Sequence, residues 1–276
     1  MGVPEAEQLV RAINRKLMQP AEAPKAAKPL LPSGEPQPDQ AASRAAASCS
    51  VSEVRQLATL IDHTLLRPEA TRAQIEQLCA EALQWGFAVV CVHSGWVPLV
   101  AEQLRGSRVN VGSVTGFPFG ANLTSAKCAE TEAAIRAGAR EIDMVMNIGA
   151  MRSGDTSLVE DDVRAMAETC HARGVLLKVI LENAYLDDGQ KVRACQLSQQ
   201  AGADFVKTST GLASSGATVA DVRLMRKTVG REMGVKAAGG IRNLADALRM
   251  LEAGANRLGT SAGVAIVIEA DRRLRE

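Results

Sequence analysis

From residue 51 onward the chain repeats one pattern, in which an amphipathic stretch ends at a glycine and a short apolar run follows immediately. The periodicity of the amphipathic stretches predicts helices, and the apolar runs, rich in β-branched residues, predict strands. Glycine suits the end of each helix because the residue there adopts a left-handed conformation that a Cβ disfavours. The glycines at these helix-to-strand junctions are Gly86, Gly106, Gly138, Gly174, Gly202, Gly234 and Gly254.

The order of these elements favours a closed architecture. Seven junctions imply strands two to eight, and residues 60–65 supply the first strand. The strands are almost continuously apolar, as expected when both faces of a parallel sheet are covered. We therefore predict an α/β fold, a (β/α)8 TIM barrel over residues 51–276. A doubly wound open sheet is the alternative, although the Gly-x-Gly-x-x-Gly turn usual after its first strand is missing.

The N-terminal part follows a different pattern. Residues 4–19 predict an amphipathic helix, and residues 20–50 form a Pro/Ala-rich stretch typical of a flexible linker. We expect residues 1–19 to stand apart from the barrel, on a mostly disordered extension whose removal changes neither stability nor turnover. The apolar face of this helix consists of Leu9, Val10, Ile13 and Leu17.

Composition and charge narrow the class of protein. The chain has 276 residues, 46% of them hydrophobic, and its 32 basic and 31 acidic residues give a net charge of +1. This balance provides no electrostatic surface for nucleic acid or an anionic membrane. Neither a bilayer-spanning apolar run nor a signal-peptide core is evident. The six cysteines and three histidines lack metal-ligand spacing, so we expect a cytoplasmic globular protein with neither metal nor other cofactor.

Polar side chains gather where the predicted strands end, which is where the catalytic groups of such barrels lie. Three of them are lysines within apolar strands, Lys178, Lys207 and Lys236, although lysine is seldom buried without a partner. Each lysine could simply reach the strand end or pair with a carboxylate. Because Asp62 and Asp143 accompany them, the set favours a catalytic cluster.

Clustered lysines suit Schiff-base chemistry. A lysine with an ordinary pKa near 10.4 is almost entirely protonated at neutral pH, and only the neutral amine is nucleophilic. A neighbouring ammonium group and partial desolvation lower the pKa and raise the neutral fraction. The neutral amine attacks a carbonyl, and the protonated imine that results stabilises an adjacent carbanion without a metal ion.

Glycines after the last three predicted strands indicate a phosphate site. Thr-Gly at 210–211, Gly-Gly at 239–240 and Gly-Thr-Ser at 259–261 place small residues at turns that lead toward helices. Exposed N–H groups at such turns bind anions, and the loops after strands seven and eight are the usual phosphate site of these barrels. Ordinary turn glycines are the alternative.

The segments around the predicted strands closely resemble the 2-deoxyribose-5-phosphate aldolase family, in the same order and spacing from about residue 55 to residue 268. The resemblance implies a metal-free class I aldolase on a (β/α)8 barrel. It also implies reversible cleavage of 2-deoxy-D-ribose 5-phosphate to D-glyceraldehyde 3-phosphate and acetaldehyde through a lysine Schiff base. Another class I phosphosugar aldolase or transaldolase, or a catalytically silent paralogue, is the alternative. The segments are LIDHTLL (60–66), TGFPFGAN (115–122), EIDMVMNIGAM (141–151), LLKVILE (176–182), DFVKTSTG (204–211), VKAAGGIR (235–242) and RLGTSAG (257–263).

The resemblance also implies roles for individual residues. Lys207 corresponds to the Schiff-base lysine, Lys236 to a second lysine that lowers its pKa, and Asp143 to the carboxylate of the proton relay. Leu212 replaces a lysine that some members carry, and Ala262 a second serine, and we expect both to affect phosphate affinity rather than the chemistry. The substrate-binding positions are Asp62, Thr64, Lys178 and Thr210, and the phosphate-binding positions are Gly211, Gly239, Gly240 and Ser261.

The expected partners follow from the same resemblance and from the N-terminal segment. They are small phosphosugar and aldehyde substrates and a second copy of the chain in a homodimer, with neither nucleic acid nor a membrane. An amphipathic helix joined to an enzyme by a Pro/Ala-rich linker resembles the targeting peptides of bacterial microcompartment cargo enzymes. Residues 4–19 are therefore expected to bind a compartment shell or another cargo protein, and a tail of no consequence is the alternative.

Overall fold

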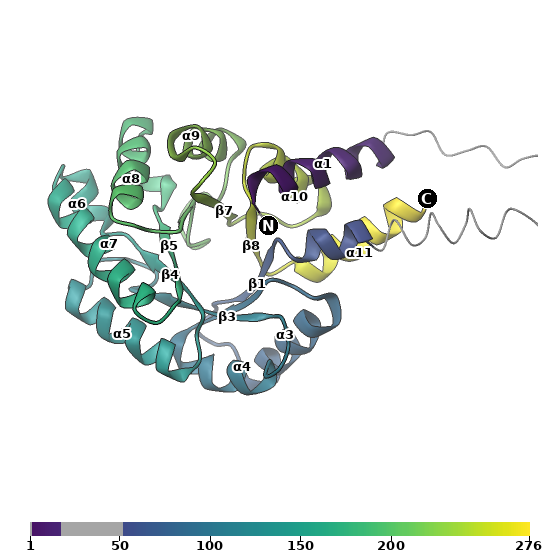
Figure 1. Cartoon of the computed structure of the whole chain (residues 1–276), viewed down its shortest axis with the longest axis horizontal. Helices are drawn as coiled ribbons and strands as arrows, with labels where there is room; N and C mark the ends of the chain where they lie inside the picture. The colour runs from purple at the N-terminus through teal and green to yellow at the C-terminus, as the bar shows by residue number, and fades with distance from the viewer. Residues whose placement is uncertain (1, 18–51) are drawn as a thin grey trace, which may run out of the picture.

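The computed structural model describes residues 2–17 and 52–276 and contains a closed barrel of eight parallel strands in chain order (Figure 1). A pair between the first and the last strand closes the ring. The predicted TIM barrel is confirmed, and the open-sheet alternative is wrong. The strands are β1 (Ile61–Leu65), β2 (Val89–Val92), β3 (Asn110–Thr115), β4 (Glu141–Val145), β5 (Leu176–Ile180), β6 (Phe205–Lys207), β7 (Gly234–Ala238) and β8 (Arg257–Thr260).

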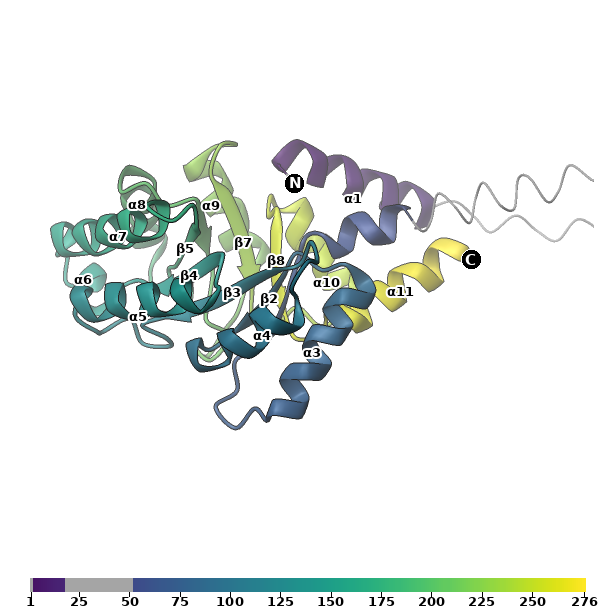
Figure 2. The ribbon, with the colours of Figure 1, turned by 60° about the horizontal axis from the view of Figure 1, so that its bottom comes forward.

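Helices cover the outside of the barrel in alternation with the strands (Figure 2). Apolar side chains between the strands and these helices form the main core. Local sequence sets the helix starts: Thr71 and Asp187 form reciprocal capping boxes with glutamines three residues later. The helices are α3 (Arg72–Trp85), η1 (Ser94–Trp96), α4 (Val97–Gln103), α5 (Thr124–Ala137), α6 (Ile148–Arg152), α7 (Thr156–His171), η2 (Asn183–Tyr185), α8 (Asp188–Gln200), α9 (Val219–Val229), α10 (Leu244–Glu252) and α11 (Gly263–Arg275).

One of the predicted junction glycines has a different role. Six of the seven have positive φ angles, between +65° and +121°, as expected of a residue that follows a helix. Gly234 is instead the first residue of β7, where a Cβ would lie 2.1 Å from the ring of Phe205. Gly230, with a φ angle of +71°, ends α9 in its place. The assignment of Gly234 as a helix end is therefore wrong.

The N-terminal helix α1 (Val3–Leu17) lies against the barrel rather than apart from it (Figures 1 and 2). It contacts α10 and α11, and its apolar face, including Leu9 and Ile13, is buried. Polar contacts flank this face, since Asn14 donates a hydrogen bond to Glu252 and Glu7 lies 3.4 Å from Arg231. The expectation of a separate helix is therefore wrong, because the barrel itself covers its apolar face. The predicted linker, residues 20–50, lies outside the described residues.

Candidate active site

Strand register brings charged side chains together inside the barrel. Lys207 on β6 lies opposite Lys236 on β7, and Asp143 on β4 lies opposite Lys178 on β5. Opposed residues of parallel neighbours project from the same face of the sheet. These four side chains and Asp62 on β1 are buried. The structure thus assembles all five charged residues that the sequence marked as candidates.

Asp143 is the central acceptor of this cluster. Its Oδ2 atom accepts from the Nζ of Lys207 at 2.8 Å and from the Nζ of Lys236 at 2.7 Å. Its Oδ1 atom accepts from the Nζ of Lys178 at 2.9 Å. One carboxylate therefore contacts three ammonium groups, and two of them share a single oxygen atom.

Two further residues, Glu141 and Arg257, complete the cluster and were not among the predicted site residues. Glu141 lies 2.6 Å from Lys178, and the Arg257 guanidinium lies 3.2 Å from Glu141 and 2.8 Å from Asp62. Asp62 also accepts a hydrogen bond from Lys236. The period of a strand was the available signal, because Glu141 stands two residues before Asp143 on β4 and faces the same side.

These contacts shift the pKa values of the three lysines in different directions. Burial lowers the pKa of Lys207, and although Asp143 acts to raise it, Lys236 lowers it again, so that the net shift is downward. Burial also acts to lower the pKa of Lys178 and of Lys236, but there the neighbouring carboxylates outweigh it and both pKa values are raised. Burial would raise the pKa of Asp143, yet the three lysines hold it well below its ordinary value.

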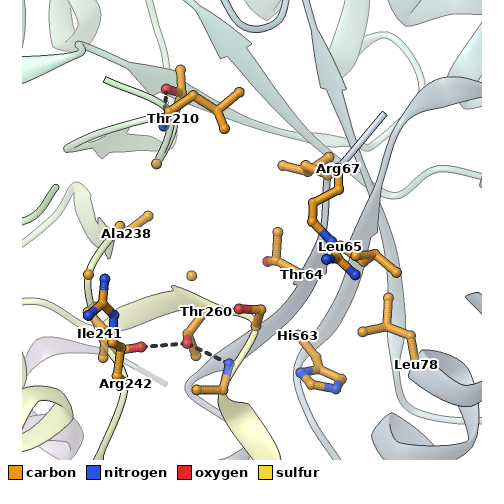
Figure 3. A pocket seen from close by; sticks show the side chains of 18 of the residues that line it. His63, Thr64, Leu65, Arg67, Leu78, Thr210, Ala238, Ile241, Arg242 and Thr260 are labelled. Carbon is orange, nitrogen blue, oxygen red and sulfur yellow. Dashed lines mark hydrogen bonds between the residues drawn. The ribbon is translucent and has the colours of Figure 1, made fainter. Parts of the chain in front are cut away.

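A cavity of about 760 Å³ opens at the carboxyl ends of the strands (Figure 3), and its lining includes one member of the charged cluster, Lys207. Of the described residues that line it, Lys207 is the one lysine. Lys178, Lys236 and Asp143 are buried and do not belong to its lining. A small molecule in the cavity can therefore reach Lys207 directly, with the other charged groups behind that lysine.

The predicted phosphate residues line one side of the same cavity. They come from the loops after β6, β7 and β8, and the glycines among them have φ angles between +80° and +91°. Two arginines that the sequence reasoning missed, Arg67 and Arg242, lie on opposite walls of the cavity in Figure 3. Arg242 is the last residue of the VKAAGGIR segment, so its position in the chain was the available signal. The predicted residues are Gly211, Gly239, Gly240 and Ser261.

Thr64 and Thr210, predicted to bind substrate, also line the cavity. The hydroxyl of Thr64 donates to the carbonyl of Asp62 at 2.8 Å, and the hydroxyl of Thr210 donates to Glu182. His63 lines the cavity as well and lies 2.7 Å from Glu81, and burial lowers its pKa. The two threonines are thus held by the backbone or by a carboxylate on the side away from free solvent.

No helix within residues 2–17 or 52–276 is both long and apolar enough to cross a membrane. A family model described as DeoC/LacD family aldolase matches residues 56–268. The deoxyribose-phosphate aldolase of Streptococcus sanguinis is 58% identical over 207 residues, which cover 75% of this chain and 93% of that protein.

Solved aldolases are similar in structure as well. The deoxyribose phosphate aldolase of Aeropyrum pernix, described as a unique tetramer, superposes with a TM-score of 0.74 at 31% identity, covering 84% of this chain and 97% of that one. An aldolase designated QR15 gives a TM-score of 0.75 at 37% identity, covering 79% of this chain and 96% of that one.

Proposed function

This chain belongs to the DeoC/LacD family of aldolases, and on that basis we propose that it cleaves 2-deoxy-D-ribose 5-phosphate reversibly to D-glyceraldehyde 3-phosphate and acetaldehyde. The observation that carries the assignment is the placement of Lys207. Lys207 lines the cavity, and the one carboxylate that it contacts among the described residues, that of Asp143, is shared with two other lysines. A nucleophilic lysine needs both properties, access to a carbonyl and a lowered pKa.

The reaction begins when the neutral amine of Lys207 adds to the aldehyde carbon C1 of the open-chain sugar. The hydroxyl group of this adduct takes up a proton and leaves as water, which gives a protonated imine. A base then removes the proton of the C3 hydroxyl, the C2–C3 bond breaks, and its electron pair moves into the imine to form an enamine. D-Glyceraldehyde 3-phosphate leaves with C3 as its aldehyde. Protonation of the enamine at C2 and hydrolysis of the imine release acetaldehyde and restore the lysine.

The number of carboxylates around each cation selects Lys207 as the group that loses its proton. Lys178 contacts Asp143, Glu141 and, at 3.8 Å, Asp62. Lys236 contacts Asp62 and Asp143. Among the carboxylates of residues 2–17 and 52–276, Lys207 contacts that of Asp143 alone. The cluster contains four cations and three carboxylates, so loss of a proton from Lys207 makes the net charge of the cluster zero. Opposite charges favour the protonated form of the other two lysines.

Asp143 and Lys236 are the groups that we assign to proton transfer. Asp143 touches the amines of both Lys207 and Lys236. A carboxylate held between two amines can receive a proton from one and return it to the other, which is the arrangement that a relay requires. Before the reaction starts, Lys236, held protonated by Asp62 and Asp143, also places a positive charge beside Lys207.

We assign the phosphate of the substrate to the loops after β6, β7 and β8. Their glycines, which have no side chain and positive φ angles, line the cavity, and Arg242 adds a positive charge. Backbone N–H groups and guanidinium groups are the usual donors to phosphate. Leu212, where a lysine would add charge, leaves this task to the backbone, to Ser261 and to the arginine.

Trapping with acetaldehyde and borohydride tests the proposed function. Borohydride reduces the imine to a stable ethylamine, and peptide mapping should locate the added ethyl group on Lys207, with loss of activity. A label on Lys178 or Lys236 would overturn the assignment. Turnover with other phosphosugars but not with deoxyribose 5-phosphate would favour another class I aldolase or transaldolase, and absence of trapping would favour a silent paralogue.

We further propose that residues 4–19 direct the enzyme, otherwise cytoplasmic, to a bacterial microcompartment. The amphipathic pattern of this segment, joined to the barrel through residues 20–50, supports the idea. Val10 and Ile13 are buried against the barrel, so binding to a shell requires α1 to leave α10 and α11. A fluorescent protein fused to residues 1–20 should enter compartments in a host that makes them, whereas Val10→Glu with Ile13→Glu should stay outside. Diffuse fluorescence of both fusions would reject targeting.

The homodimer inferred from the family resemblance is also a proposal, and the tetramer reported for the Aeropyrum pernix relative is the obvious alternative. Light scattering of the full-length chain distinguishes the two. A mass of twice 29.1 kDa is expected, and a mass four times that of the chain would overturn the proposal.

A further inference from the structure

Glu182, just after β5, has a backbone conformation that glutamate rarely adopts. Its φ and ψ angles are 55° and 64°, and it is the one non-glycine residue with a positive φ among residues 2–17 and 52–276. This left-handed conformation costs about 1–3 kcal/mol for a side chain other than glycine. A glycine would satisfy the backbone at lower cost, so the strain indicates that the side chain itself is required.

The strain coincides with an irregularity where the ends of β5 and β6 meet. The N–H of Leu181 donates to the carbonyl of Lys207 at 2.9 Å, and the N–H of Asn183 donates to the carbonyl of Thr208 at 3.0 Å. Between these two hydrogen bonds the chain advances by two residues at the end of β5 but by only one residue at the end of β6. Glu182 is therefore the extra residue of a bulge. Bulges beside active sites commonly redirect a side chain.

The redirected carboxylate binds the loop that follows the lysine proposed to form the Schiff base. Glu182 is 2% exposed, and its two oxygens accept from the N–H of Thr210 at 3.2 and 3.4 Å. It also accepts from the hydroxyl of Thr210, whose oxygen in turn accepts from the N–H of Leu212 at 3.1 Å. Backbone and side chain of Thr210 are therefore both fixed by one buried carboxylate, and the turn through Gly211 is fixed with them.

We propose that Glu182 is a positioning residue that sets the turn at Thr210, Gly211 and Leu212 so that the N–H of Gly211 faces the phosphate of the substrate. The inference rests on the proposed function and deepens it. All three turn residues line the substrate cavity, whereas Glu182 does not. The carboxylate therefore acts through the turn rather than on the substrate. Loss of the hydrogen bonds that Glu182 accepts should weaken phosphate binding and leave the chemistry at Lys207 intact.

The matched control is Asp204, which links the same two strands at their opposite end. Asp204 directly precedes β6, and its carboxylate accepts from the N–H of Leu177, near the start of β5, at 2.8 Å. Asp204→Ala and Glu182→Ala thus both remove a carboxylate that binds a backbone N–H between β5 and β6. Only Glu182 lies at the end of the strands where the cavity opens.

The experiment measures kcat and KM for deoxyribose 5-phosphate and for deoxyribose, and the Kd for inorganic phosphate by calorimetry. Glu182→Ala should raise the KM of the phosphorylated sugar and the Kd about tenfold, because it removes two hydrogen bonds to a charged group. The kinetics with deoxyribose should stay within about twofold of the wild type. Glu182→Gln, which retains an acceptor oxygen, should recover most of the phosphate affinity. Asp204→Ala should lower the melting temperature and change neither the KM nor the Kd.

Equal losses with the two sugars, or an unchanged Kd for phosphate in Glu182→Ala, would overturn the inference. Glu182→Gly relieves the backbone strain, and it replaces the alanine variant if that variant does not fold. Acetaldehyde trapping at Lys207 is scored in parallel. If the wild type fails to trap, the proposed aldolase function fails, while the phosphate titration still decides the role of Glu182.

Discussion

Replacing Lys236 with methionine should make Lys207 harder to deprotonate. The substitution keeps the length and the apolar stem of the side chain and removes its charge. Lys207 then loses a neighbouring cation and no longer shares Asp143 with Lys236. Both changes act in the same direction on the amine, because each favours its protonated form. Since only neutral Lys207 attacks the substrate, activity that rises with pH in the wild type should rise at a higher pH in the variant.

The size of the shift follows from the geometry. The Nζ atoms of Lys207 and Lys236 are no more than about 5.5 Å apart, because both donate to Asp143 Oδ2, at 2.8 and 2.7 Å. Two unit charges at that distance repel by about 3 kcal/mol at an effective dielectric constant of about 20. That energy corresponds to about two pKa units. At neutral pH the fraction of neutral Lys207 should therefore fall about a hundredfold from this cause alone.

The assay is the pH dependence of kcat/KM for deoxyribose 5-phosphate. Where turnover is too slow to follow, the rate of borohydride trapping with acetaldehyde takes its place. Lys127→Met is the matched control, since Lys127 is fully buried and pairs with Asp162 at 2.6 Å, outside the barrel cluster. The control should lose stability and keep the wild-type acid limb. A folded Lys236→Met enzyme with an unmoved acid limb would refute the reasoning.

Three further predictions address the phosphate site, the N-terminal helix and the buried carboxylates. Ser261→Asp should lower kcat/KM for deoxyribose 5-phosphate at least tenfold more than for deoxyribose, because it places a negative charge beside the phosphate; equal losses in steady-state assays would count against the site. Ile13→Ala, at a fully buried position of α1, should lower the free energy of unfolding in urea by about 2 kcal/mol; an unchanged midpoint would show that α1 does not dock. The pKa of Asp62 is lowered to about 2, against the pull of burial, mainly by Lys236 and Arg257. The stability that ionised Asp62 contributes to the folded protein is thus fully present above the ordinary pKa near 3.9 and is lost as pH falls toward 2. The melting temperature of the wild type should therefore drop over this range, and that of Asp62→Asn should drop less steeply.

The barrel could be predicted from the sequence because its signals are local. Each apolar run is long enough for one strand, and six of the seven glycines end helices by a conformation that depends on a single residue. The prediction for Gly234 was wrong because a glycine before an apolar run can also be required by packing. There the ring of Phe205 leaves no space for a side chain, and no local pattern records a neighbouring strand.

The position of α1 could not be predicted for a related reason. Periodicity identified the face that is buried but not the surface that covers it. That surface belongs to α10 and α11, more than two hundred residues farther along the chain. Likewise, Arg257 opens β8 as an ordinary charged residue in the sequence. Its importance comes from partners on β1 and β4, which only the folded barrel brings near.

Closure of the barrel gives Lys207 and Lys236 different carboxylate partners, and this difference supports the proposal that Lys207 is the nucleophile. Because β8 pairs with β1, Asp62 from the first strand lies beside Arg257 of β8 and Lys236 of β7. In an open sheet with the same strand order, β1 would lie at the far edge and Lys236 would lose Asp62. Lys207 and Lys236 would then both depend on Asp143 alone, and no difference in carboxylate contacts would separate their pKa values. The ring supplies that difference, since Asp62 holds the proton on Lys236 and leaves Lys207 as the amine that can give one up.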